Sequence, residues 1–434
     1  MTEAADLIPA VPAAQVTLLL IQLTALLAVA IVLGRVAQRF GQPAIVGELL
    51  TGVLLGPSVL GNAVPAITDR LWPRDGQTHL VDAVAQVGVV LLVALTGSEL
   101  NFGELRRRRL TVTWVGSLAF VLPLAVGVLL GLGAPGVLLG PAGERGVFAA
   151  YVGVAFCVTA IPVIAKTLTD MNLLHRDVGQ LALTCAAVDD AAGWFLLSLV
   201  SAAATAGISL RSESVTLLAI VGVVLVAWLA RRPAHAWAAR AAKGDPLRGT
   251  AAAAVLILLG SGATAALGLE PILGAFLVGV VLATEAGRAV LRPMRTLVLS
   301  VLAPLFLATA GLRVDLGLLG RPVVGLAALT TVVLAVASKI VGGYAGARLG
   351  RLNHWESFAL GSAMNGRGLV EIVVAAIGLR LGLLTPATYT ILVLMALVSS
   401  MLAPPLLRYT MRRVDQRAAE ALEAAGEVTL PATR

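Results

Sequence analysis

The chain has 434 residues, of which 58% are hydrophobic and 13% are charged, and its formal net charge is +8. So few charged side chains cannot cover the surface of a soluble globular protein of this length. The positive charge does not point to nucleic acid, because the arginines lie in short loops between apolar segments, as they do in membrane proteins. The composition therefore indicates an all-α polytopic protein of the lipid bilayer, with no nucleic-acid partner.

Thirteen apolar segments, separated by glycine, proline and charged clusters, are predicted to be transmembrane helices. They cover residues 15–34, 43–60, 80–98, 110–132, 147–168, 177–205, 213–230, 249–267, 271–286, 296–312, 322–347, 356–379 and 386–407. The residues before them carry acids and no basic region, so a cleaved signal peptide is not expected. Both cysteines, Cys157 and Cys185, lie in apolar segments, which argues against a disulfide framework or a zinc site.

The basic residues of the loops fall mainly on one side of the predicted membrane. That side collects 22 of the 32 lysine and arginine residues, and the other side collects seven. Since cytoplasmic loops carry the excess of basic residues, we predict an outside N-terminus and a cytoplasmic C-terminus in the cell inner (plasma) membrane. The remaining three, Lys166, Lys339 and Arg367, fall inside predicted spans. Snorkelling explains Lys166, whereas the deeper Lys339 needs a carboxylate partner, in a structural or a functional ion pair.

Two adjacent acids, Asp189 and Asp190, lie in the middle of the apolar segment LALTCAAVDDAAGWFLLSLV, residues 181–200. A carboxylate at membrane depth costs several kcal/mol, so it faces the protein interior or a water-filled cavity and marks an ion or proton path. The pair is therefore the leading candidate for an ion-binding site.

Two predicted spans contain residues that interrupt a helix. Residues 147–168 hold Thr159 and Pro162, and residues 356–379 hold Asn365 in the sequence MNGRG. Unwound backbone at membrane depth is tolerated only where it is buried in protein or lines a cavity, and paired interruptions mark the binding site of a transporter. A plain proline kink and a glycine-rich packing face are the alternative.

The interrupted spans occupy equivalent places in two triplets of spans. Residues 110–205 and residues 321–411 each contain a continuous, a broken and a continuous span, at an odd offset that reverses their orientation. This order is typical of inverted-topology repeats, whose interface at the midplane holds substrate and coupling ion. We expect the broken helices to cross there, beside Asp189, Asp190 and Lys339.

Arg367 and Glu371 flank the second interruption, four residues apart. On a continuous helix this spacing favours a local ion pair, which here would neutralise the half-helix ends. Direct ligation of an ion is the alternative.

Eight segments together carry a resemblance to a known family. They are QPAIVGELLTGVLLGPSVLG (42–61), VALTGSELNFGELRR (93–107), VTAIPVIAKTLTDMNLL (158–174), AAVDDAAGWFLL (186–197), APLFLATAGLRVDL (303–316), SKIVGGYAGARL (338–349), ESFALGSAMNGRGLVEIVV (356–374) and ILVLMALVSSMLAPPLL (391–407). With these segments the chain resembles the Kef-type monovalent cation:proton antiporters of the second cation:proton antiporter family, which have a sodium/hydrogen exchanger-like membrane domain.

The resemblance implies a thirteen-helix antiporter fold with two crossed discontinuous helices, a homodimer and an alternating-access cycle that exchanges Na⁺ or K⁺ for protons. Asp190 matches the obligatory ion-binding aspartate of the family, Asp189 the variable position before it, and Lys339 the lysine that pairs with this site. Two acids with a lysine resemble the electrogenic type. Because the exchanger branch that other motifs resemble usually has Asn-Asp, the stoichiometry and the choice of Na⁺ or K⁺ stay open.

The predicted spans and the resemblance together divide the chain into seven parts. They are an extracellular N-terminus (1–14), dimerisation-side helices 1–3 (15–109), core helices 4–6 (110–205), linker helix 7 (206–230), dimerisation-side helices 8–10 (231–320), core helices 11–13 (321–411) and a cytoplasmic tail (412–434). The tail has no glycine-rich phosphate loop, so no cytosolic regulatory domain is expected in this chain. Its residues 412–425 are compatible with a short amphipathic helix or with a solvated, disordered end.

The expected chemistry is competition between protons and a monovalent cation for one set of oxygen atoms. The carboxylates of Asp190 and Asp189, the Thr159 hydroxyl and unwound carbonyls would supply oxygen ligands to the transported cation, with no cofactor. A symporter on the same fold is the closest alternative. An intramembrane aspartyl protease would need its two acids on separate helices. A channel or receptor would not need an acid pair matched with a buried lysine. We therefore predict a transporter rather than an enzyme, and we expect it to have a role in pH homeostasis.

Overall fold

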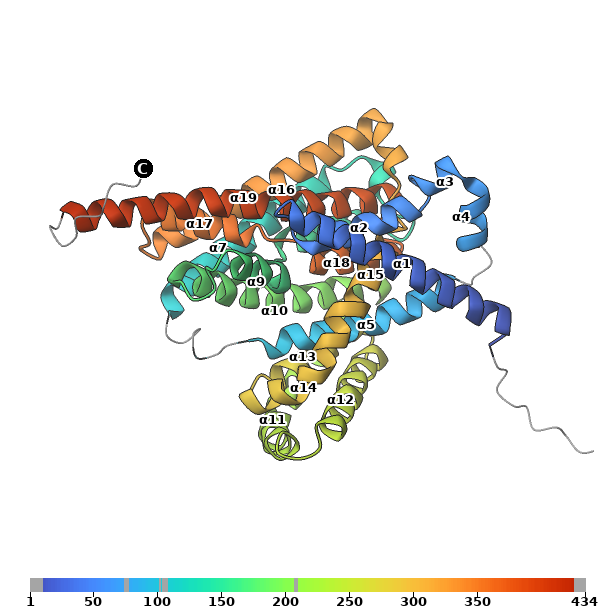
Figure 1. The fold of residues 1–434 in the computed structure, drawn as a ribbon, viewed down its shortest axis with the longest axis horizontal. Helices are drawn as coiled ribbons and strands as arrows, with labels where there is room; N and C mark the ends of the chain where they lie inside the picture. Colours follow the sequence, from blue (N-terminus) through green and yellow to red (C-terminus); the bar gives the residue numbers. More distant parts are fainter. Residues whose placement is uncertain (1–10, 74–77, 101–102, 104–107, 207–209, 425–434) are drawn as a thin grey trace, which may run out of the picture.

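The computed structural model describes residues 11–73, 78–100, 103, 108–206 and 210–424, and within these ranges the fold is helical throughout (Figure 1). The helices are α1 (Ala13–Arg39), α2 (Ala44–Leu55), α3 (Leu60–Ala63), α4 (Pro65–Leu71), α5 (Thr78–Ser98), α7 (Arg109–Leu132), α8 (Arg145–Cys157), α9 (Ile161–Asp170), α10 (Asp177–Ala206), α11 (Leu210–Ala241), α12 (Pro246–Ala266), α13 (Pro271–Val281), α14 (Glu285–Leu297), α15 (Ala303–Gly311), α16 (Pro322–Leu349), α17 (His354–Met364), α18 (Leu369–Arg380) and α19 (Pro386–Ala424). Short helical turns cover Gly136–Leu138, Val298–Leu302 and Leu316–Gly320.

Most of these helices are suited to a bilayer. Among the described residues, ten helical segments are long and apolar enough to cross a membrane, or eleven if α17 and α18, which meet at a 40° bend, form one span. The prediction of an all-α polytopic membrane protein is confirmed. The count of thirteen is not, because the predicted spans 147–168 and 271–286 contain α8 and α13, which have only 13 and 11 residues.

Two helices extend well past their predicted ends. Helix α11 continues to Ala241, beyond the predicted end at residue 230, and α19 continues to Ala424, so the described part of the predicted tail, residues 412–424, is helical. Both extensions are rich in alanine and arginine, which favour helix in water as well as in lipid, so hydropathy does not mark where the helix ends. The predicted extracellular residues 1–10, the loop arginines 74, 106 and 107, and the end of the chain from residue 425 lie outside the described residues.

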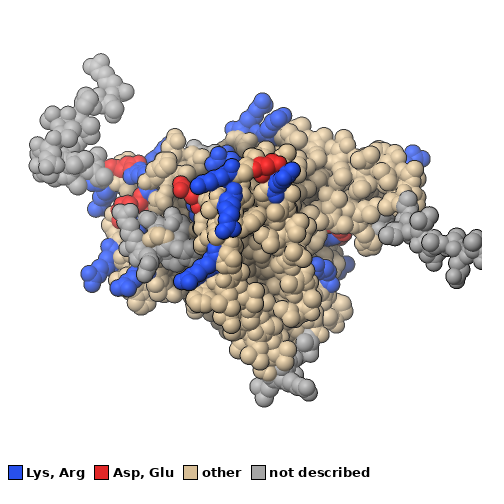
Figure 2. All heavy atoms as spheres, turned by 90° about the horizontal axis from the view of Figure 1, so that it is seen from below, with Lys and Arg blue, Asp and Glu red and all other residues tan. Residues whose placement is uncertain are grey.

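Basic side chains gather toward one end of the molecule. Figure 2 shows most of the visible lysine and arginine side chains on the half where α19 ends, and few near the opposite end, where α1 begins. This distribution agrees with the alternation of basic loops in the sequence.

The helices pack in two groups. In the first, here called the core group (α7–α10 and α16–α19), α7 lies along α8 and α16, while α17 packs on α16 and α19. In the second, here called the scaffold group (α1, α2, α5 and α12–α15), α2 packs on α1 and α15, and α13 packs on α5 and α12. Helix α11 lies against α13, α14 and α10.

Glycine allows very close helix contact inside the core group. A Cβ atom at Gly342 of α16 would lie 2.4 Å from the carbonyl oxygen of Leu118, and one at Gly346 would lie 2.5 Å from that of Trp114, both on α7. Small residues are the usual means of tight helix packing in membranes, where the hydrophobic effect does not drive helices together. The α7–α16 pair is therefore expected to move as one body.

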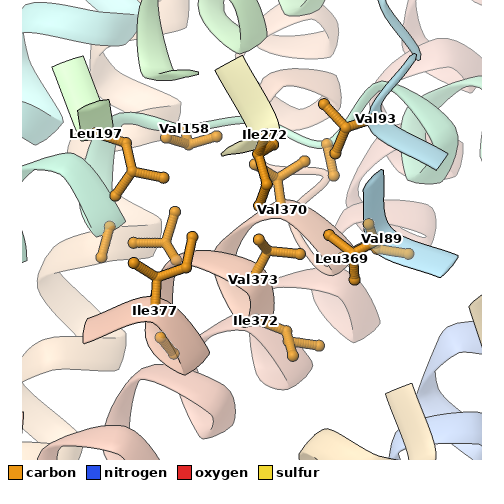
Figure 3. Packing of buried hydrophobic residues seen from close by; sticks show 14 of the residues in the cluster. Val89, Val93, Val158, Leu197, Ile272, Leu369, Val370, Ile372, Val373 and Ile377 are labelled. Carbon is orange, nitrogen blue, oxygen red and sulfur yellow. The ribbon is translucent and has the colours of Figure 1, made fainter. Parts of the chain in front are cut away.

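The boundary between the two groups is largely apolar. Figure 3 shows this packing of buried side chains, which come from α5, α10, α13, α18 and the segment after α8. The labelled residues are Val89, Val93, Val158, Leu197, Ile272, Leu369, Val370, Ile372, Val373 and Ile377. Helix α18 contributes half of them and so forms much of the core-group side of this boundary.

Candidate functional site

The two interrupted helices meet at their breaks. Helix α8 ends at Cys157 and α9 begins at Ile161, while α17 ends at Met364 and α18 begins at Leu369. The backbone N–H of Ala160 donates a hydrogen bond of 3.2 Å to the carbonyl oxygen of Gly366. The predicted crossing of the two broken spans is therefore confirmed.

Each break has a local cause. Pro162 lies in the first turn of α9, where a missing backbone donor costs nothing, so it starts the second half-helix and does not occupy the break itself. The break falls on the extended residues before it, Val158 to Ala160. In the other helix, Gly368 has φ 152° and ψ −101°, a conformation essentially limited to glycine.

An ion pair lies directly beside the crossing. The Lys339 ammonium lies 2.8 Å from Oδ2 of Asp189 and donates a second hydrogen bond of 2.5 Å to the carbonyl oxygen of Cys157, at the end of α8. The Thr159 hydroxyl donates to the same Asp189 oxygen at 2.9 Å. Lys339 and Asp189 are 0% and 1% exposed, so the pair is fully removed from solvent. The carboxylate partner that the sequence required for Lys339 is thus Asp189.

Asp190 has a different environment. It is 0% exposed, and neither carboxylate oxygen accepts a hydrogen bond from any described residue. Its neighbour in the chain, Asp189, and Glu371, in the first turn of α18, are carboxylates as well. A buried carboxylate that lacks both a donor and a counter-ion must be neutralised. A bound proton or a bound cation can each do this, which is the property a site of exchange requires.

Arg367 closes the free end of the first half-helix. Its guanidinium donates to the carbonyl oxygens of Ala155 at 3.3 Å and Phe156 at 2.6 Å, the last residues of α8, and to Ala335 of α16 at 3.3 Å. The last carbonyls of a helix have no partner within it and carry partial negative charge. A buried cation at this position satisfies both needs.

The expected local pair of Arg367 with Glu371 is wrong. Glu371 instead accepts a hydrogen bond of 2.7 Å from the backbone N–H of Gly368, at the start of α18. The two charges make no ion pair in the described structure, because the non-helical Gly368 lies between them and the i, i+4 spacing applies only along a continuous helix. Each charge neutralises a different half-helix end, the arginine at α8 and the glutamate at α18.

Two further polar residues belong to the crossing. Asn365 caps the C-terminus of α17 and is fully buried, and neither atom of its amide group has a hydrogen-bond partner among the described residues. Ser400 of α19 donates to the carbonyl oxygen of Arg367 and was not predicted. Its sequence signal was the adjacent pair of serines, Ser399 and Ser400, in an otherwise apolar span.

The family model of the transmembrane sodium/hydrogen exchangers matches residues 24–413. The chain belongs to this family. Its members are transporters and not enzymes, so the protease alternative is not supported.

Curated relatives of this chain include antiporters of different size. It is 30% identical over 395 residues to Na(+)/H(+) antiporter NhaS4 of Synechocystis sp., covering 90% of this chain and 96% of the relative. It is 33% identical over 376 residues to Cation/H(+) antiporter 19 of Arabidopsis thaliana (84% and 46%), and 28% identical over 378 residues to K(+)/H(+) antiporter 1 of Saccharomyces cerevisiae (84% and 43%). The exchanger thus spans nearly all of the cyanobacterial relative and about half the length of the plant and yeast relatives.

A solved structure confirms the fold. The sodium proton antiporter MjNhaP1 of Methanocaldococcus jannaschii, determined at pH 8, superimposes with a TM-score of 0.67 over 91% of this chain and 98% of that one. Sequence identity is 14%, so this likeness concerns the fold alone.

Proposed function

We propose that this protein is a secondary active transporter that moves Na⁺ or K⁺ in exchange for protons. One observation carries the proposal: Asp190, fully buried and without a hydrogen-bond partner among the described residues, lies next to the Asp189–Lys339 ion pair, where two broken helices cross. The names of the relatives, which include Na(+)/H(+) and K(+)/H(+) antiporters, support the same function.

The proposed cycle uses the two aspartates differently. With no cation bound, Asp190 holds a proton and Asp189 is paired with Lys339. An incoming cation takes oxygen ligands from Asp190, from Asp189, from the Thr159 hydroxyl and from carbonyls at the breaks, and it displaces the proton. Once Asp189 turns to the cation, the buried Lys339 loses its counter-ion and releases a second proton. Two protons then leave for each monovalent cation, so the exchange is electrogenic.

The same packing suggests which parts move. In the proposal the core helices (residues 110–205 and 321–411) carry the site and move against the dimerisation-side helices (15–109 and 231–320), with residues 206–230 as linker. The two groups of helices in the fold agree with this division, and their largely apolar boundary contains few directional contacts that would resist sliding. A homodimer held by the scaffold group would provide the fixed frame.

The asymmetry of basic residues supports an orientation. We place the N-terminus outside and the C-terminus in the cytoplasm of the inner (plasma) membrane, because loops rich in arginine stay on the cytoplasmic side. In this orientation, exchange of cations for protons would contribute to cytoplasmic pH homeostasis.

The test is exchange by purified protein in proteoliposomes. An imposed pH gradient is followed with an internal pH dye while Na⁺, K⁺, Li⁺ or choline is added. We expect one or more alkali cations, but not choline, to collapse the gradient, and Asp190→Asn to abolish the effect. The matched control is Asp177→Asn, at the exposed start of the same helix α10, which should transport normally. A cation-driven proton flux in the same direction as the cation would refute exchange in favour of symport, and unchanged activity of Asp190→Asn would refute the site.

A further inference from the structure

One ion pair crosses the boundary between the two helix groups. Seven ion pairs are formed among the described residues, and six of them join residues that lie on, or next to, helices of the same group. The seventh joins Glu270, the residue before α13 of the scaffold group, to Arg380, the last residue of α18 in the core group, with 3.0 Å between Oε2 and Nη2.

Glu270 is held firmly in this position. Its side chain is only 7% exposed, whereas the Arg380 side chain is 50% exposed. Its backbone N–H also donates a hydrogen bond of 3.1 Å to the hydroxyl of Ser198 on α10, another helix of the core group. The first residues of α13 are therefore tied to two core helices at once, by a backbone contact and by a charge pair.

The pair lies beside a cavity that opens along the same boundary. The cavity has a volume of about 470 Å³ and is lined by α5, α13 and α15 on the scaffold side and by α18 on the core side. Its lining includes the charged residues Asp82, Arg313 and Arg380, together with His79. In the proposed orientation it faces the outside, because α5 and α13 begin, and α18 ends, at this side.

The inner wall of the cavity is the apolar layer of Figure 3. Ile272 of α13 and Val373 and Ile377 of α18 both line the cavity and belong to this layer. Val373 is 2% exposed and only two residues from Glu371, at the site end of α18. The layer therefore separates the cavity from the charged residues at the helix crossing.

We propose that the Glu270–Arg380 pair is an outer latch that holds α13 and α18 together and keeps the apolar layer closed between the cavity and Asp190. The inference rests on the proposed alternating-access function, since only a site that opens to this side needs a latch. For the site to become accessible from the cavity, α18 must move away from α13, and this movement separates the two charges. The latch thus stabilises the state that is closed on this side.

The test measures access to the apolar layer, without measuring transport. Val373→Cys is introduced on the cavity wall and labelled from the outer face with a membrane-impermeant maleimide. The native Cys157 and Cys185 are buried, and their background labelling is measured on protein that lacks Val373→Cys. Glu270→Gln and Arg380→Gln should each raise the labelling rate about fivefold or more, because loss of the pair shifts the population toward the open state.

Two controls make the result specific. The exchanged pair Glu270→Arg with Arg380→Glu should return the rate toward that of the parent, which simple damage to the fold would not do. Asp82→Asn breaks the pair with Arg313 that lies in the same cavity but joins α5 to the end of α15 within the scaffold group, and it should leave the rate unchanged. Unchanged labelling in both single variants, or an equal rise in Asp82→Asn, would overturn the latch.

The latch and the proposed function fail in different experiments. If the proteoliposomes show no exchange while the labelling responds as expected, the contact controls access to the layer but antiport is wrong. If exchange is observed and the labelling does not respond, the function stands and the latch is wrong.

Discussion

The buried pair of Lys339 and Asp189 permits a quantitative test of the site. Both side chains are removed from solvent, and each has one further partner: Lys339 donates to the Cys157 carbonyl oxygen, and Asp189 accepts from the Thr159 hydroxyl. Lys339→Met removes the cation and leaves a buried carboxylate with a single neutral donor. We expect a loss of about 3–5 kcal/mol in the free energy of unfolding, the usual cost when one member of a buried pair is removed.

The double variant makes the prediction sharper. Asp189→Asn alone leaves the Lys339 ammonium with one carbonyl, at a similar cost of a few kcal/mol. When Lys339→Met and Asp189→Asn are combined, both charges disappear together and the desolvation penalty disappears with them, so the double variant should lose only about 1 kcal/mol or become more stable. The coupling energy between the two positions, which is the sum of the two single losses minus the loss in the double variant, is then about 5 kcal/mol or more.

Unfolding of the four proteins by sodium dodecyl sulfate in mixed micelles, followed by tryptophan fluorescence, provides the free energies for the cycle. The reasoning is refuted if Lys339→Met costs under about 1 kcal/mol, or if the double variant loses the sum of the two single losses, because additivity means that the residues do not interact. The same variants test the proposed cycle: without Lys339 one proton should leave per cation, and a potential-sensitive dye should record no charge movement during exchange.

Three further perturbations test other parts of the structure. Gly342→Ala places a methyl group 2.4 Å from a carbonyl oxygen of α7 and should lower the free energy of unfolding by about 1–3 kcal/mol. The control Gly222→Ala, whose new methyl group meets no atom within 4 Å, should stay within about 1 kcal/mol of the parent. Equal melting temperatures of the two variants in detergent would contradict the close packing of α7 and α16. Arg367→Met removes three hydrogen bonds to carbonyl oxygens and should lower the free energy of unfolding by about 3 kcal/mol or more, with Arg367→Lys intermediate. A fully stable Arg367→Met would show that the end of α8 needs no cation. Asn353→Ala removes the N-cap of α17, which belongs to a capping box, and should cost about 1 kcal/mol with exchange retained; a loss of exchange in stable protein would assign this cap a role beyond stability.

The sequence alone determined the membrane architecture and the central charges. Long apolar segments have no stable place outside a bilayer, and a carboxylate or an ammonium within them has no place without a partner or a function. For this reason Asp189, Asp190 and Lys339 stood out without coordinates. The sequence required a carboxylate partner for Lys339, and the structure identifies it as Asp189. The crossing of the broken helices followed from proline, glycine and the repeated order of spans.

Only the tertiary structure decided the contacts that involve the backbone or distant parts of the chain. Arg367 is held by carbonyl groups, which every residue possesses, so no sequence pattern could name Ala155, Phe156 or Ala335 as its partners. The spacing of Arg367 and Glu371 was misleading, because the helix is broken between them. Glu270 and Arg380 lie 110 residues apart, and only the packing of the two helix groups, with α13 against α10, brings them together. Hydropathy and helix periodicity describe the surroundings of a segment and its near neighbours in the chain, whereas partners across a helix boundary are set by how the whole bundle packs.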